Sequence, residues 1–249
     1  MLGSNNFIKV AIMVGLFVTS LSSQVFAKPS LVAEMADLDQ AIIPAASNSN
    51  EKKVEATKAA VSRLQSQWSL FFTSTKDAFP GDKEWLNGLE QVDKNIAEVA
   101  KASEEGNLPK VHEILEGVRN TFEGLREKRK IEYYLDGFSR YRRVLEKTTA
   151  ILAGKKAADL TDADMVFVTS MVPDLKSSWA SVQAAQLDAQ LFKFDATKVA
   201  EIQSAMDSVR KNIEKLEAVV PNGNRDQVFE ALNLLKPSLK RAFLMFGKF

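Results

Sequence analysis

Apolar residues recur three and four positions apart along most of the chain after residue 54. The run Val61, Leu64 and Trp68 shows this spacing, and Val228, Leu232, Leu235 and Leu239 repeat it near the other end. This period matches the turn of an α-helix, so one face of each segment is expected to be buried. Strand-like alternation is not found. The pattern predicts an all-α protein built from antiparallel helical bundles.

Turn and capping residues divide this pattern into separate helices. A Pro-Gly pair at residues 80–81 ends one helix, and Asp82 is placed to cap the next. Asn107 and Asn224 are further candidate caps, and Thr161 with Asp164 three residues later resembles a capping box. A break or bend is expected near residues 128–130, before a helix over residues 131–152.

Two prolines are expected to limit helices, because proline lacks an amide hydrogen and its ring clashes with the preceding turn. Residues 28–53 predict a short helix that ends at Pro44 and a polar linker that follows it. Pro173 is expected to kink or interrupt the helix that begins near residue 161.

Two pairs of short segments indicate an internal duplication. LQSQW at residues 64–68 matches LKSSW at 175–179, and VDKNI at 92–96 matches VRKNI at 209–213. The register changes only between these helices, where residues 187–194 resemble an insertion. We therefore predict one bundle repeat over residues 54–154 and a second over 161–249, with Trp68 and Trp179 buried. The second repeat has only three helices, so the N-terminal helix or a merged bundle must complete it.

The first 27 residues have the pattern of a secretory signal peptide. A short segment with one charge, Lys9, precedes an uncharged apolar run, and Val25 and Ala27 fit the small-residue cleavage site. A membrane span needs about 20 apolar residues, more than this run offers. We predict removal after Ala27 and a periplasmic location. An uncleaved membrane anchor is the alternative.

Charge and cysteine content exclude several classes of function. Without Lys9 the mature chain has 32 basic and 32 acidic residues, a balance that argues against a nucleic-acid binder. The chain has no cysteine, which excludes disulfides, thiolate metal sites and a cysteine nucleophile. No segment after the signal is apolar enough to span a membrane.

His112 is the only histidine and the only candidate for a cofactor ligand. Histidine in a helical bundle can bind haem opposite a methionine, and four methionines are available for this: Met165, Met171, Met206 and Met245. The alternative is a half-exposed histidine at the boundary of the apolar face. A single histidine without cysteine makes a catalytic zinc site or a histidine-based triad untenable.

The most distinctive local feature is a tyrosine-rich and arginine-rich segment over residues 126–143. Tyrosine and arginine together are typical of recognition surfaces, and here they could hold an anionic small ligand or an acidic protein. The candidate binding residues are Tyr133, Tyr134, Arg140, Tyr141, Arg142 and Arg143. The alternative is a solvated basic face whose tyrosines cover the edge of the bundle.

These observations predict an exported helical-bundle protein that acts by binding or as a structural partner, without catalysis. The second hypothesis is a carrier of haem or a metal that uses His112. An enzyme comes third, because it would need carboxylates or tyrosines around a closed pocket, and no sequence motif indicates one.

Overall fold

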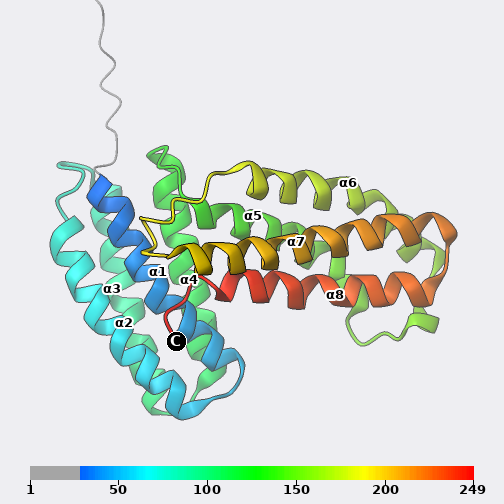
Figure 1. The fold of residues 1–249 in the computed structure, drawn as a ribbon. Helices are drawn as coiled ribbons and strands as arrows, with labels where there is room; N and C mark the ends of the chain where they lie inside the picture. Colours follow the sequence, from blue (N-terminus) through cyan, green and yellow to red (C-terminus); the bar gives the residue numbers. More distant parts are fainter. Residues whose placement is uncertain (1–28) are drawn as a thin grey trace, which may run out of the picture.

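The computed structural model describes residues 29–249, and within that range every regular element is helical (Figure 1). The predicted signal peptide, residues 1–27, lies outside the described residues. None of the described helices is both long and apolar enough to cross a membrane. The α-helices are α1 (Pro29–Asn50), α2 (Val54–Thr75), α3 (Lys83–Glu104), α4 (Leu108–Lys128), α5 (Tyr134–Thr149), α6 (Asp162–Ala184), α7 (Ala196–Val219) and α8 (Arg225–Leu244).

The helices form two groups of four, which we name the N-bundle (α1–α4) and the C-bundle (α5–α8). In the N-bundle α1 packs against α2 and α4, and α3 closes the ring by packing against both α2 and α4. In the C-bundle α5 packs against α6 and α8, and α7 closes the ring in the same way. Figure 1 shows the two bundles side by side, with their helix axes at a steep angle to each other.

This grouping differs from the repeats that the sequence suggested. We predicted that the helix over residues 131–152 would complete a repeat over 54–154, whereas the corresponding helix, α5, packs against α6 and α8. The helix that packs with α2–α4 is α1, which had been offered as a candidate to complete the second repeat, not the first. Helix periodicity shows which face is buried, but it does not show which other helix covers that face.

The prediction that Pro44 ends the first helix is wrong. Helix α1 continues through Pro44 to Asn50, and residues 42–49 are buried. A proline leaves the carbonyl four residues earlier without its helical donor. Here that carbonyl belongs to Gln40, and the amide of Lys248 donates to it at 3.0 Å. A distant segment therefore supplies the missing hydrogen bond. Helix α6 likewise runs through Pro173 without interruption.

The other local predictions are confirmed. Asp82, Asn107 and Asn224 each accept a hydrogen bond from a backbone amide of the first helical turn, and Thr161 forms the capping box with Asp164. Residues 129–133 separate α4 from α5.

The predicted core residues are also in place, since Trp68 and Trp179 are both buried. Trp179 packs against Phe138 and Tyr141, with ring centroids 5.7 and 4.9 Å apart.

A cluster of charged side chains joins the two bundles. Arg126 of α4 donates to both carboxylate oxygens of Asp136 in α5, at 2.9 and 2.5 Å. The hydroxyl of Tyr133 donates to Asp39 of α1 at 2.8 Å. Burial raises the pKa of Asp39 above its ordinary value, although Arg126 opposes that shift. The contacts hold α1, α4 and the start of α5 together, and so fix the angle between the bundles.

Candidate ligand-binding pocket between the bundles

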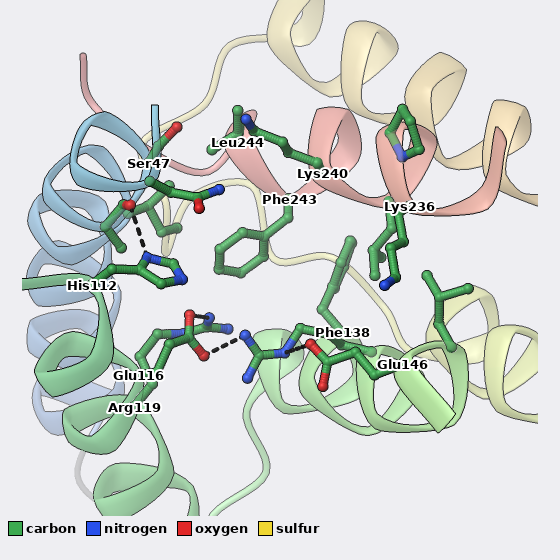
Figure 2. Close-up of a pocket in the computed structure, with 17 residues that line it drawn as sticks. Ser47, His112, Glu116, Arg119, Phe138, Glu146, Lys236, Lys240, Phe243 and Leu244 are labelled. Carbon is green, nitrogen blue, oxygen red and sulfur yellow. Dashed lines mark hydrogen bonds and ion pairs between the residues drawn. The ribbon is translucent and has the colours of Figure 1, made fainter. Parts of the chain in front are cut away.

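A cavity of about 740 Å³ lies where the two bundles meet (Figure 2). Its walls come from the last turns of α1, from α4 and α5, and from the C-terminal half of α8. Pockets of about 300–1,000 Å³ commonly hold small ligands, and such pockets often lie between domains or between helices. Here the volume results from the steep angle between the bundles, which prevents their helices from packing along their full lengths.

One side of this cavity, which we call the interbundle pocket, is apolar. Phe138 and Leu145 of α5 and Leu239 of α8 are buried core residues whose side chains also reach the pocket. Ile43 of α1 and Phe243 of α8 extend this surface. Figure 2 shows Phe243 pointing from α8 into the space between α8 and α4. The apolar side is therefore built from the cores of both bundles and has little freedom to rearrange.

Next to this apolar side, the pocket carries an ion-pair cluster centred on Glu116 of α4. Arg119, one turn later on the same helix, lies 3.2 Å from Glu116 Oε1. Arg142 of α5 pairs with the other oxygen, Glu116 Oε2. The Nε atom of Arg142 has no hydrogen-bond acceptor among the described residues, and the nearest carboxylate, Glu146, is 3.7 Å away. Two guanidinium groups thus share one carboxylate.

Further contacts hold this cluster in position. Arg119 donates to the hydroxyl of Ser139 at 3.3 Å, and its guanidinium lies 4.4 Å from the centre of the Phe243 ring. Stacking on an aromatic face stabilises a cation. Partial burial would raise the pKa of Glu116, but Arg119 and Arg142 outweigh that effect and lower it below the ordinary value. Glu116 is therefore ionised at neutral pH.

The pocket carries an excess of positive charge. Lys236 and Lys240 of α8 join Arg119 and Arg142 in its lining, against the carboxylates of Glu116 and Glu146. Lys240 pairs with Glu51 at 2.7 Å, whereas Lys236 makes no ion pair within residues 29–249. An apolar wall beside an excess of basic side chains suits a ligand with an apolar body and an anionic group.

His112 also lines this pocket, one turn before Glu116 on α4. Its Nδ1 atom lies 3.1 Å from the carbonyl oxygen of Ala46, and the side chain is half-buried. No methionine lines the pocket, so none of the four methionines considered above faces His112 there. No group of three potential metal-ligating side chains occurs in the described part of the chain.

The tyrosines and arginines that the sequence singled out are divided between two hollows and the core. Tyr141 is fully buried against Trp179, and Tyr133 is buried and donates to Asp39. Of the six, only Arg142 lines the interbundle pocket. The helical period explains this division, because neighbouring residues of a helix face different directions.

The remaining residues of that segment border a second hollow of about 1,020 Å³. Tyr134 and Arg140 line it together with Tyr133, and Arg143 makes two hydrogen bonds to Glu123, both 2.8 Å long. Acidic side chains outnumber basic ones in its lining. This charge balance does not favour the anionic ligand that the segment suggested.

Sequence reasoning missed most of the residues that make the interbundle pocket. Glu116 and Arg119 resemble an ordinary ion pair on a helix surface, and Phe243 resembles a core residue. Lys236 had no distinguishing feature. One signal was present, since Glu116 follows His112 by four residues and the two share a helix face. That signal could not show that α5 and α8 complete the site.

Comparisons with known proteins add no assignment: no family model matches the chain, and neither a curated protein nor a solved structure is significantly similar to it.

Proposed function

We propose that this chain is an exported, non-catalytic binding protein that holds a small amphipathic anion in the interbundle pocket. The observation that carries the proposal is the pairing of an apolar wall with the guanidinium groups of Arg119 and Arg142. Arginine binds carboxylates well because its planar group offers parallel donors. Burial of an apolar body would supply affinity, and the charged head would fix the orientation of the ligand.

A small ligand fits the pocket better than the side of a protein would. The cavity lies between helices of both bundles, and its apolar residues are themselves core residues. A concave surface of this size suits a small molecule, whereas protein partners usually cover broad, flatter areas.

The proposed location and ancestry rest on sequence patterns. The signal-like residues 1–27 support export to the periplasm. The matched segments that suggested a duplication lie in α2 and α6 for the first pair and in α3 and α7 for the second. The first pair therefore occupies the second helix of each bundle and the second pair occupies the third helix, which supports the origin of both bundles from one four-helix unit.

Titration calorimetry with dodecanoate, below its micellar concentration, tests the proposal. Dodecanoate should bind, while dodecanol and dodecyltrimethylammonium, which share its apolar chain, should bind at least about tenfold more weakly or not at all. Arg142→Gln should weaken binding of dodecanoate by about tenfold or more, because the head group loses a charged donor.

Arg143→Gln is the matched control, since Arg143 is the next residue, pairs with Glu123 of α4, the helix that also carries Glu116, and lies outside the pocket. It should leave dodecanoate binding unchanged. Absence of dodecanoate binding, or equal binding by the Arg142 and Arg143 variants, would refute the proposed site.

A further inference from the structure

The ion pairs between α4 and α5 differ in how easily they can exchange partners. The side chains of Arg126 and Asp136 are only 6% and 9% exposed, so that pair is sealed inside the protein. Glu116 and Arg142 are 20% and 28% exposed and border the interbundle pocket. A solute in the pocket can therefore reach the second pair but cannot reach the first.

The geometry at Glu116 resembles that of a bound carboxylate ligand. One oxygen of Glu116 faces Arg119 and the other faces Arg142, so the carboxylate bridges two guanidinium groups from different helices. A ligand carboxylate has the same two oxygens and the same charge. It could take this position without leaving either guanidinium unpaired, which removes the large penalty for an isolated buried charge.

We infer that the ligand is a monocarboxylate whose head group competes with Glu116 for Arg119 and Arg142. This inference rests on the proposed function. It adds the chemistry of the ligand's head group and a residue of the protein that limits the binding affinity. Glu116 acts as an internal competitor that weakens binding and so promotes release. The displaced side chain remains near positive charge, because Lys236 lines the same pocket.

Glu116→Gln tests the competition directly, because it keeps the shape of the side chain and removes its charge. The variant should bind dodecanoate about tenfold or more tightly than the wild type does. Glu123→Gln is the matched control. It removes the other α4 glutamate that pairs with an arginine of α5, outside the pocket, and should leave the affinity unchanged. Equal or weaker binding by Glu116→Gln, with binding by the wild type intact, overturns the inference alone.

Glu116→Ala provides a second test with a different readout. It leaves a space the size of a carboxylate between the two guanidinium groups, so acetate should raise the melting temperature of this variant. Acetate should leave the wild type and Glu123→Ala unaffected. A variant with no response to acetate would contradict the bridging geometry, whatever the outcome with dodecanoate.

A measurement on the wild type avoids the risk that a variant is misfolded. In protein labelled at arginine side-chain nitrogens and glutamate carboxyl carbons, dodecanoate should shift the signals of Arg119, Arg142 and Glu116 together. If dodecanoate binds while the Glu116 carboxyl signal stays unchanged, Glu116 is not displaced. If the wild type does not bind dodecanoate at all, the proposed function fails along with this inference.

Discussion

The two bundles place a tryptophan at matching positions but support it differently. In the N-bundle the indole nitrogen of Trp68 donates to Asp93 at 2.7 Å. In the C-bundle the indole nitrogen of Trp179 is buried and has no acceptor among residues 29–249. The sequence match places Arg210 where the N-bundle has Asp93, and Arg210 pairs instead with Glu214 at 2.6 Å.

This difference shows which part of a bundle is constrained by packing. Both indole rings fill the core, and each contacts other aromatic rings of its own bundle. The hydrogen-bond acceptor for the indole N–H lies at the surface, and only the N-bundle supplies one. An unpartnered indole N–H lowers the stability that the ring can contribute. We therefore expect the indole N–H of Trp68 to contribute more to the free energy of unfolding than that of Trp179.

The largest expected effect comes from breaking the ion pair that joins the bundles. Arg126→Ala should lower the free energy of unfolding by about 3–5 kcal/mol, because Asp136 would stay buried without its partner. Urea unfolding followed by circular dichroism measures this loss.

Arg143→Ala is the control for that prediction. It removes a more exposed pair between the same two helices, and should change stability by about 0–1 kcal/mol. If both substitutions reduce stability equally, the buried pair is not what holds the bundles together.

A smaller effect separates the two tryptophans. Replacement by phenylalanine removes similar volume from each core, so the difference between the variants isolates the indole hydrogen bond. Trp68→Phe should be about 1–2 kcal/mol more destabilising than Trp179→Phe, as judged by urea unfolding. Combining either substitution with Asp93→Ala should remove that difference. Equal losses of stability in the single variants would show that the hydrogen bond from Trp68 to Asp93 adds no stability.

The smallest effect is expected at the matched helix caps. Asn107 accepts from the amide of Lys110 at 3.3 Å, and Asn224 accepts from that of Gln227 at 3.0 Å. Asn107→Ala and Asn224→Ala should each reduce stability by about 1 kcal/mol in thermal or urea unfolding. Clearly unequal losses would show that the two turns, despite the shared Gly-Asn sequence, are not equivalent.

Most of the helices could be predicted from the sequence, because caps and apolar spacing act within a few residues. Asp82, Asn107 and Asn224 cap their helices as expected. Pro44 did not end α1, because its effect is offset by a hydrogen bond from Lys248, which no local rule can anticipate. The grouping of helices could not be predicted either, since each amphipathic face fits several partners.

The pocket was less predictable than the fold. The composition of the segment over residues 126–143 predicted a binding surface, but its side chains point in several directions. Of its candidate binding residues only Arg142 reaches the pocket, where it meets Glu116 from the previous helix. A site assembled from four helices leaves no compact motif, because each helix contributes residues that look ordinary on their own.

The hydrogen bond between Gln40 and Lys248 bears on the order of folding. During synthesis the N-terminal residues emerge first, so α1 is complete in the chain before its last partner exists. Until residues 247–249 arrive, the Gln40 carbonyl has only water as a donor. Gly247 also packs so closely that an added Cβ would lie 2.8 Å from Ile43. We therefore expect the N-bundle to reach its final packing late, with folding of the two bundles coupled through a contact of very long sequence separation.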